Sequence, residues 1–583
     1  MTVVSEMNEA ATFDRTTEST VTPVAAVSPQ GFCVEVNQLS RRVQVRRRGE
    51  VTLLNAVSFA VGAGELVAIV GVSGAGKTTL LEAIAGVAPT TSGSVRFDGI
   101  DLRANLRKFR VVIGYVPQDD IIHADLPLQR TLRYAARLRL PSSVTAAEVD
   151  HAVRAAIDTV GLTEQVDVRV GSLSGGQRKR ASIAVELLTE PRAFFLDEPT
   201  SGLDPATSAE LIAHLRELAD RSATVVFTTH SAEDLDLCDR IVFMAPGGRV
   251  GFVGTVAEAL EHFGVRAVPE LYRRLANVDT PTDGTDTAGA VPVLDVGTHD
   301  VTRRPVASGI TQWGVLTRRS LETFVRNPLT LAILVASPAL VVGMFAILFR
   351  PGAFDFQDPS PSSMVMVGFW VVFAAFFFGL TYGLLQICTE RAILRRERLV
   401  GLRLGAYVAS KVTVLVPFLL VVVVAMLAVL RLLDRLPSRP LLTYASMAVG
   451  LLLCAVAALG LGLLTSALVR NVAQATLALP MLCFPAVLFA GAILPVNLMA
   501  KAGAVLSMMM PSRWAFEAVG HDLGARQILA HGGSKLGPPL LASFGDAGTA
   551  STGTYWLILA AFAVLLLVAT WGVLVRSTSS AMR

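Results

Sequence analysis

The sequence predicts a two-part fold, an α/β P-loop domain followed by an all-α membrane domain of six spans. Hydrophobic residues make up 52% of the 583 positions and the mean hydropathy is +0.54, which is more apolar than a soluble protein of this length. The apolar excess is uneven, because residues 1–310 carry charge throughout whereas residues 329–575 contain long runs with almost none. A glycine-rich phosphate-binding pattern occupies residues 71–78 of the charged part.

The charged part has three sections that differ in composition. Residues 1–30 are rich in Thr, Ser, Val and Ala and lack the apolar core of a signal peptide, so we expect a disordered tail. Residues 31–265 alternate short apolar runs with helical patterns, which predicts an α/β domain. Residues 266–310 are dominated by Pro, Gly, Thr and Asp, which is typical of a flexible linker.

Three apolar runs in the α/β section read as buried parallel strands. They are Leu66–Val70, Ala193–Leu196 and Thr224–Phe227, and each runs directly into a loop of polar residues or glycines. Ligands of open parallel sheets gather at the C-terminal ends of the strands. The loops that follow these runs are therefore the first place to look for a site.

The apolar part begins with an amphipathic stretch and continues with six segments long enough to cross a bilayer. Residues 311–328 read as a connecting helix on the membrane surface, with an ordinary soluble helix as the alternative. A span needs about 20 apolar residues. The expected spans of the 329–583 domain are residues 329–349, 363–387, 409–430, 441–468, 473–494 and 555–575.

The arginines of the connecting loops predict the orientation of these spans. The loop at 388–408 holds five arginines, whereas the loop at 350–362 holds one arginine against two aspartates. Positive loops stay in the cytoplasm, so 388–408 is expected inside, and six spans then leave both termini inside. Arg431, Arg435 and Arg439 are an exception, because this order places them outside.

The stretch from Gly71 to Thr78 fits the P-loop pattern in its required context, after a strand and before a helix. Small residues let backbone N–H groups close around phosphates, and the following helix N-terminus favours negative charge. Lys77 is expected to reach the β- and γ-phosphates of ATP, and the Thr78 hydroxyl to ligate Mg²⁺. The expected binding residues of this loop are Gly71, Ser73, Gly74, Ala75, Gly76, Lys77, Thr78 and Thr79.

Two carboxylates end the second predicted strand. Asp197 is expected to hold Mg²⁺ directly or through water, and Glu198 to act as the general base toward the attacking water. An apolar run that ends in Asp-Glu is weak alone. The P-loop about 120 residues upstream makes it a strong indication of an ATPase.

The pentapeptide Leu173-Ser174-Gly175-Gly176-Gln177 resembles the LSGGQ signature of the ABC ATPase family, and it is the most specific motif in the chain. The resemblance implies that this segment caps the nucleotide held by the opposite subunit. Ser174, Gly175, Gly176 and Gln177 are the residues it would contribute. A helix N-terminus with a hydroxyl and two glycines suits such an anion.

Other motifs of the same family follow in the expected order. Gln118 resembles the Q-loop glutamine, which implies contact with Mg²⁺ and a catalytic role in sensing the membrane domain. Asp204, in the stretch Ser201-Gly202-Leu203-Asp204, resembles the D-loop that crosses the dimer interface. His230 resembles the catalytic switch histidine near the γ-phosphate.

An ATPase domain that precedes six spans resembles the G subfamily, the White/ABCG type of half-transporter, in a prokaryotic form. The strings CTERAILRRERLVGLRLGAY, FAGAILP and PSRWAFEA support this in the membrane half. The resemblance implies an ABC-2-like exporter domain. It also implies that Arg391, Arg396 and Glu397 couple the two domains in the cytoplasm of a multi-pass cell-membrane protein.

One chain carries one P-loop and one signature, so the family mechanism requires a dimer, with a homodimer expected and a heterodimer as the alternative. The expected function is ATP-driven export of a hydrophobic or lipidic small molecule. Phe373, Phe377 and Phe484 are the hypothetical substrate contacts, with ordinary lipid-facing or packing roles as the alternative.

Two other functions remain open from the sequence. One is dedicated export of a cell-envelope lipid or glycan precursor, and the other is a membrane-anchored ATPase with a signalling or mechanical role. The expected partners are a second subunit, the lipid bilayer and the cargo, and nucleic acid is not expected. The net charge of +4 is too small to indicate nucleic acid, and the five cysteines show no metal-ligand spacing.

Overall fold

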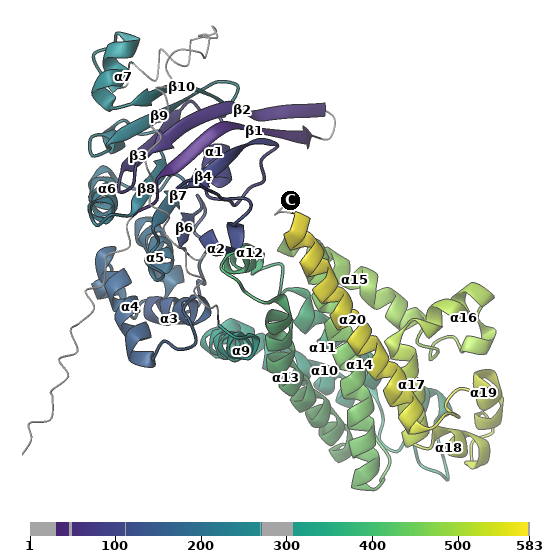
Figure 1. Cartoon of the computed structure of the whole chain (residues 1–583). Coiled ribbons are helices and arrows are strands. Elements are labelled where there is room, and N and C mark those ends of the chain that lie inside the picture. Colours follow the sequence, from purple (N-terminus) through teal and green to yellow (C-terminus); the bar gives the residue numbers. More distant parts are fainter. Residues whose placement is uncertain (1–30, 46–48, 111, 269, 271–306, 581–583) are drawn as a thin grey trace, which may run out of the picture.

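The computed structural model describes residues 31–45, 49–110, 112–268, 270 and 307–580. The expected tail at 1–30 and most of the expected linker at 266–310 lie outside these residues, so both remain predictions. The chain forms an α/β domain and a helical domain, and the short helix α12 (Arg391–Leu399) lies between them (Figure 1).

Two sheets build the α/β domain. The first is mainly antiparallel, with strand order β2-β1-β4-β5. Its strands are β1 (Val34–Val45), β2 (Gly49–Val61), β4 (Ser92–Phe97) and β5 (Ile100–Asp101). The second has the order β10-β9-β3-β8-β7-β6. Its strands are β3 (Leu66–Gly71), β6 (Ile113–Val116), β7 (Ala193–Leu196), β8 (Thr224–Thr228), β9 (Arg240–Ala245) and β10 (Arg249–Gly254).

The three predicted strands are present as β3, β8 and β7, which are parallel neighbours in the second sheet. Successive residues of β3 enter two different cores. Leu66 and Ala68 pack in one core, whereas Val67 and Ile69 pack in the other. Burial on both faces explains why these strands read as continuous apolar runs, and the parallel order brings their C-terminal ends to one edge.

Helices surround this sheet, and side-chain caps fix where several of them begin. Thr145, Ser174 and Asp204 accept hydrogen bonds from backbone N–H groups in the first turns of α4, α5 and α6. The helices of the α/β domain are α1 (Lys77–Ile84), α2 (Leu106–Phe109), α3 (Leu128–Arg139), α4 (Ala146–Thr159), α5 (Gly175–Leu187), α6 (Pro205–Asp220) and α7 (Val256–Phe263).

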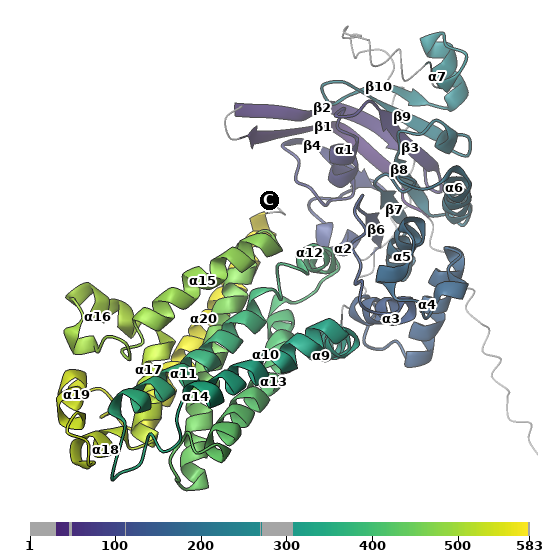
Figure 2. The same ribbon diagram turned by 180° about the vertical axis from the view of Figure 1, so that it is seen from behind.

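The helical domain contains a helix near each of the six predicted spans. These helices are α10 (Pro328–Leu348), α11 (Pro361–Leu384), α13 (Leu404–Leu432), α14 (Leu441–Leu468), α15 (Val472–Leu488) and α20 (Thr552–Ser580). Within the described residues, α11, α13, α14 and α20 are long and apolar enough to cross a membrane, and α10 and α15 contribute shorter apolar stretches. The C-terminal end of α20 lies on the side of the helical domain that faces the α/β domain (Figure 2). An even number of membrane crossings requires this side.

The fifth predicted span is too long. The sequence predicts residues 473–494, but α15 ends at Leu488 after 17 residues. That is about 25 Å of helix, short of a hydrocarbon core of about 30 Å. The chain remains apolar to residue 494, yet Gly491 has a φ of 81°, a left-handed conformation that no helix can continue through.

The segment after α15 is helical rather than irregular. It holds α16 (Lys501–Met508), α17 (Pro511–Asp522), α18 (Ala525–His531) and α19 (Gly537–Phe544), all at the end of the molecule away from the α/β domain (Figure 1). Two of the three arginines that the charge rule placed outside cap carbonyls near this end, whereas Arg431 donates to Ser438 Oγ at 2.6 Å. Arg435 donates to the Ala346 carbonyl at 2.9 Å, and Arg439 to the Leu523 carbonyl at 3.1 Å. These contacts satisfy helix C-termini and explain the exception.

Close packing of α11 against α14 forms the centre of the helical domain. A Cβ atom at Gly379 would lie 2.0 Å from the Ala455 carbonyl oxygen, and one at Gly462 would lie 2.4 Å from that of Leu380. Only glycine permits this backbone approach, which is how membrane helices commonly associate.

The connecting helix α9 (Gly309–Arg326) touches both domains. Its Trp313 Nε1 donates to Thr413 Oγ1 of α13 at 3.1 Å, and its Glu322 Oε2 accepts from the Tyr134 hydroxyl of α3 at 2.6 Å. The predicted amphipathic helix therefore exists, two residues earlier than expected at each end. Its place at a membrane surface stays a prediction.

Candidate functional site

The loop between β3 and α1 has the geometry of a phosphate cradle. Gly71, Gly74 and Gly76 all have positive φ angles, of 151°, 81° and 98°. A Cβ at Gly71 would lie 2.4 Å from the Met244 carbonyl oxygen, and one at Gly76 would lie 2.9 Å from that of Leu53. These glycines allow successive backbone N–H groups to form the concave arrangement that binds anions.

The side chain of Lys77 lies inside this loop. Its ammonium donates to the Gly71 carbonyl at 2.9 Å and to the Val72 carbonyl at 3.3 Å, and only 8% of the residue is exposed. Burial lowers the pKa of Lys77, while Glu198 and Asp197 oppose this shift. The ammonium is therefore held where an incoming phosphate would meet it, and a phosphate would compensate its burial.

A buried carboxylate lies beside the loop, with hydroxyls directed at it. Asp197 Oδ1 accepts from Thr78 Oγ1 at 3.0 Å and from Thr228 Oγ1 at 2.7 Å. Burial raises the pKa of Asp197, and the two hydroxyl hydrogen bonds lower it. A carboxylate and a hydroxyl are hard oxygen ligands, so the pair Asp197 and Thr78 fits Mg²⁺.

Glu198 lies next to both of the other predicted catalytic residues, Gln118 and His230. Its Oε2 accepts from Gln118 Nε2 at 3.1 Å, and its Oε1 lies 3.7 Å from His230 Nδ1. The backbone of Glu198 is left-handed, with a φ of 45°, and its N–H donates to Thr228 Oγ1 at 2.8 Å. A strained non-glycine residue at such a position is typical of functional sites.

The signature and the D-loop aspartate lie elsewhere on the described surface. Ser174 caps α5 reciprocally with Gln177, and both Ser174 and Gly175 are exposed. A Cβ at Gly175 would meet nothing within 4 Å. Asp204 caps α6 through Thr207 and is exposed as well. The structure thus gathers the P-loop, Gln118, Asp197, Glu198 and His230, and leaves the signature as an open helix N-terminus.

Sequence reasoning missed two residues that hold this site together. Thr228 ends β8 and binds both Asp197 and the Glu198 backbone. Lys179, on α5, donates to the carbonyls of Gln118 at 2.7 Å and Pro117 at 3.2 Å. A threonine in an apolar strand and a lysine after a signature are too ordinary to stand out. Only the fold shows what they contact.

The contact between the domains is centred on one carboxylate. Glu186 of α5 binds Arg139 of α3 through both oxygens, at 2.8 and 2.7 Å, and Arg396 of α12 at 2.7 Å. Arg396 also donates to the carbonyls of Ile121 at 2.6 Å and Ser182 at 2.8 Å. Burial raises the pKa of Glu186, but the two arginines outweigh it and lower the value to about 2.

Only one of the three predicted coupling residues makes a contact with the ATPase domain that the described part shows. Arg396 does so, as above. Glu397 pairs instead with Arg319 of α9, and Arg391 donates to the Val469 carbonyl of the membrane domain. The loop is short and rich in arginines, so the sequence could not tell which side chains point toward the ATPase domain.

The predicted substrate contacts lie on two helices, α11 and α15. Phe373 and Phe377 are partly buried on α11, with ring centroids 6.0 Å apart. Phe484 lies on α15 and is 67% exposed. It belongs to an apolar stripe on that helix, which is formed by Leu477, Met481, Phe484 and Leu488, all at least half exposed.

Comparisons with known proteins agree with this geometry. Residues 54–201 match the family described as ABC transporter, and residues 311–521 match the family described as ABC-2 type transporter. The chain is 33% identical over 495 residues to the ABC transporter ATP-binding/permease protein Rv1747 of Mycobacterium tuberculosis. That match covers 81% of this chain and 56% of the relative.

Two eukaryotic relatives match a shorter region. The broad substrate specificity ATP-binding cassette transporter ABCG2 of Bos taurus is 34% identical over 262 residues, or 42% of this chain and 38% of the relative. ABC transporter G family member 14 of Arabidopsis thaliana is 35% identical over 240 residues, or 40% of this chain and 36% of the relative. The chain spans about half the length of the mycobacterial relative and less of the other two.

Proposed function

Because the chain belongs to the ABC transporter family, with the ABCG-type order of domains, we propose that it hydrolyses ATP to export a hydrophobic or lipidic small molecule. The ATPase domain and both termini would lie in the cytoplasm of the cell membrane. The observation that carries the proposal is the cluster of Lys77, Asp197 and Glu198 around the phosphate loop of a chain that also holds a membrane domain.

The ATP chemistry follows from the contacts of this cluster. Lys77 would bind the β- and γ-phosphates, and Thr78, Asp197 and Gln118 would hold Mg²⁺, which would supply neutralisation of the phosphate charge. Glu198 accepts a proton from the attacking water, oriented by its hydrogen bond with Gln118. His230, whose Nδ1 lies 3.7 Å from the same carboxylate, would contact the γ-phosphate.

A dimer completes the site. The exposed N-terminus of α5, with Ser174 as its cap and Gly175 open to solvent, is a helix end that suits an anion. Among the described residues it makes no hydrogen bond or ion pair with the P-loop. Two chains, arranged head to tail across their ATPase domains, place the signature of each over the nucleotide of the other, with Asp204 at the boundary. Identical chains make this a symmetric homodimer.

The cargo proposal rests on the apolar stripe of α15. Leu477, Met481, Phe484 and Leu488 are exposed in one chain, and the described part of each span offers few charged groups. In a dimer, the stripes of two copies would enclose a space lined by apolar side chains, to which Phe373 and Phe377 are adjacent. A lipidic or aromatic molecule fits such a lining, whereas ions and sugars do not.

The test is the ATPase rate of the chain in lipid nanodiscs, across a panel of lipids and hydrophobic compounds. We expect a few of them to raise the rate severalfold. Glu198→Gln removes the base and should lower turnover by about 10²- to 10⁴-fold while ATP still binds. Lys77→Ala should lose both binding and turnover. A rate that depends on Glu198 but responds to no compound would contradict export and favour a membrane-anchored ATPase.

A further inference from the structure

One segment of the ATPase domain, residues 118–125, begins at Gln118 in the nucleotide site and ends against the membrane domain. Inside the ATPase domain it is held at both ends. Lys179 Nζ donates to the Gln118 carbonyl at 2.7 Å, and the Gly171 N–H donates to the Ala124 carbonyl at 2.8 Å. Both donors flank the signature. The segment must therefore follow any movement of the nucleotide site and the signature.

The same segment is held by the membrane domain from the other side. Arg396 Nη1 of α12 donates to the Ile121 carbonyl at 2.6 Å, and Asn327 Nδ2, at the end of α9, lies 3.5 Å from Asp125 Oδ1. His123 lies between these two contacts in the sequence. Its side chain is thus placed at the boundary of the two domains.

His123 is unusual because its Nε2 atom is shielded from solvent and has no hydrogen-bond partner in the part of the chain that the structure describes. A buried polar atom without a partner has lost its hydration with nothing in exchange, so native proteins rarely keep one without a reason. Burial, with a smaller contribution from Arg319, lowers the pKa of His123 to about 4, although Glu390 and Glu397 oppose the shift. The imidazole is therefore neutral, so one of its nitrogens can donate and the other accept.

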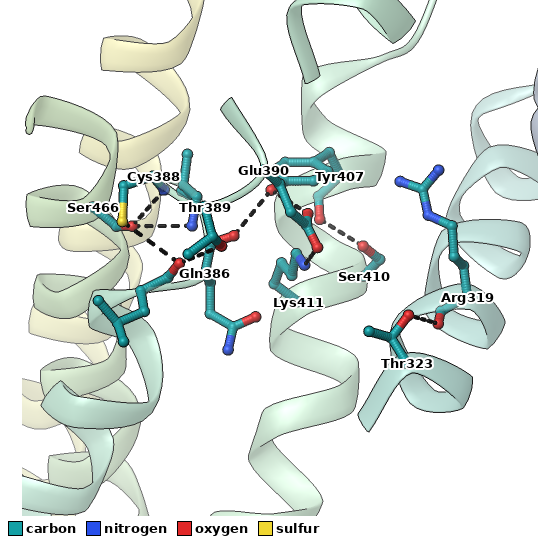
Figure 3. Close-up of polar contacts among 12 residues, drawn as sticks. Arg319, Thr323, Gln386, Cys388, Thr389, Glu390, Tyr407, Ser410, Lys411 and Ser466 are labelled. Carbon is teal, nitrogen blue, oxygen red and sulfur yellow. Dashed lines mark hydrogen bonds and ion pairs between the residues drawn. The ribbon is translucent and has the colours of Figure 1, made fainter. Parts of the chain in front are cut away.

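Four charged groups on the membrane side act on His123 electrostatically, namely Arg319, Glu390, Glu397 and Lys411. Arg319 binds Glu397 through both carboxylate oxygens, which leaves Glu390 as the acceptor for a new donor. Its Oε1 accepts from Lys411 Nζ at 2.8 Å, and its Oε2 accepts from the Tyr407 hydroxyl at 2.9 Å (Figure 3). Each carboxylate oxygen can accept a second hydrogen bond. Glu390 can therefore take a donor from the ATPase domain without losing the contacts that it has.

This cluster ties together the cytoplasmic ends of three spans. Glu390 belongs to the short segment that follows α11, and Tyr407 and Lys411 lie in the first turns of α13. The same segment is bound to α14, because Ser466 Oγ accepts from the Ile387 N–H at 3.0 Å and the Cys388 N–H at 2.9 Å (Figure 3). A displacement of Glu390 acts on all three spans.

We propose that His123 is a positioning residue for transport, whose Nε2–H donates to the Glu390 carboxylate when ATP draws segment 118–125 toward the membrane domain. The proposal rests on the function proposed above, since it presupposes ATP-driven movement. The Nε2–H of His123 has no partner among the described residues. Formation of the hydrogen bond to Glu390 would therefore stabilise the ATP-bound arrangement relative to the one described. Arg396 anchors the α12 side of the interface, and His123 carries the movement to α11, α13 and α14.

The test compares ATP-dependent hydrogen–deuterium exchange in nanodiscs, with all variants in the Glu198→Gln background so that ATP binds and is not consumed. Peptides from the phosphate loop report binding of ATP, and peptides from α16 and α17 report the response of the membrane domain. In the parent chain, ATP should change exchange in both regions. In His123→Leu and His123→Phe, ATP should still protect the phosphate loop from exchange. The exchange of α16 and α17, however, should no longer change when ATP binds.

A structural role for His123 makes the opposite prediction. Replacing an unpaired buried nitrogen by an apolar side chain of similar size would then be neutral or stabilising, and would leave the response unchanged. His123→Gln, which restores a side-chain donor, should recover at least part of it. His214→Leu is the matched control, because the Nε2 of His214 is equally buried and unpartnered but lies on α6.

The outcomes separate this proposal from the proposed function. If ATP changes the exchange of α16 and α17 in His123→Leu and His123→Phe as much as in the parent, the proposed role of His123 is wrong. ATP-driven transport would remain intact. Loss of this change in His214→Leu would also overturn the role of His123, because any buried histidine would then matter. Absence of phosphate-loop protection in the parent would overturn both proposals at once.

Discussion

At the scale of single residues, buried charges in this chain are paired where two domains meet. Glu186 holds Arg139 of its own domain and Arg396 of the membrane domain, and all three side chains are nearly inaccessible to solvent. Such a triad costs desolvation to build, but removing one member leaves the others uncompensated. The triad therefore adds little net stability, and its main effect is to fix the orientation in which the two domains dock.

Glu186→Gln should weaken the docking of α12 by about 3–5 kcal/mol, because two buried guanidinium groups lose their carboxylate. The measurement is the thermal unfolding of the chain in nanodiscs, with proteolytic release of the ATPase domain as a second readout. Glu210→Gln is the control, since Glu210 pairs with Arg180 at 3.4 Å but its side chain is 56% exposed. Equal unfolding temperatures for the two variants would contradict this role.

The same residue gives the interface a pH dependence with a defined sign. The pKa of Glu186 is lowered from 4.5 to about 2, so its contribution is complete above pH 4.5 and is lost as the pH falls toward 2. The part of the unfolding free energy that Glu186→Gln removes should therefore be constant from neutral pH down to pH 4.5. If the difference in unfolding free energy between the parent and Glu186→Gln already vanishes near pH 6, another group is responsible for the pH dependence.

At the scale of elements, the sequence was a good guide where periodicity decides the structure and a poor one where side-chain direction decides it. Apolar runs predicted β3, β7 and β8 within a residue, because strands buried on both faces have no polar positions. The same reasoning extended α15 to residue 494, because an apolar turn at Gly491 looks like a helix. For Arg391, Arg396 and Glu397, composition identified the loop but not the partner of each side chain.

The exposed stripe of α15 predicts how cargo responds to a change on that helix. Phe484→Ala removes the largest side chain of the stripe and should reduce the stimulation of ATPase by the most effective compound of the panel severalfold, with a higher half-maximal concentration. The control is Leu565→Ala, since Leu565 is comparably exposed, at 65%, on α20. Equal losses in the two variants would indicate lipid contact and would contradict a cargo role for Phe484.

At the scale of the whole molecule, the sequence correctly predicted the order of the two domains, and its motifs named residues that the fold brings close together, namely Lys77, Asp197 and Glu198. The parts that it could not predict are relations between distant segments. The contacts of Thr228 with Asp197 and of Lys179 with Gln118 are created by the fold. The same holds for the burial of His123 Nε2, which has no hydrogen-bond partner among the described residues. In the proposed dimer, the signature of a second copy would lie over the phosphate loop of the first.

The most direct test of the account is a cross-link between the phosphate loop and the signature. A chain carrying Ser73→Cys and Gly175→Cys in the Glu198→Gln background, with the native cysteines replaced, would be oxidised with and without ATP. Ser73 is exposed, and a side chain at residue 175 meets nothing within 4 Å, so both changes are tolerated. We predict an ATP-dependent species of twice the chain mass. A cross-link that forms within one chain, or none in the presence of ATP, would contradict the dimer.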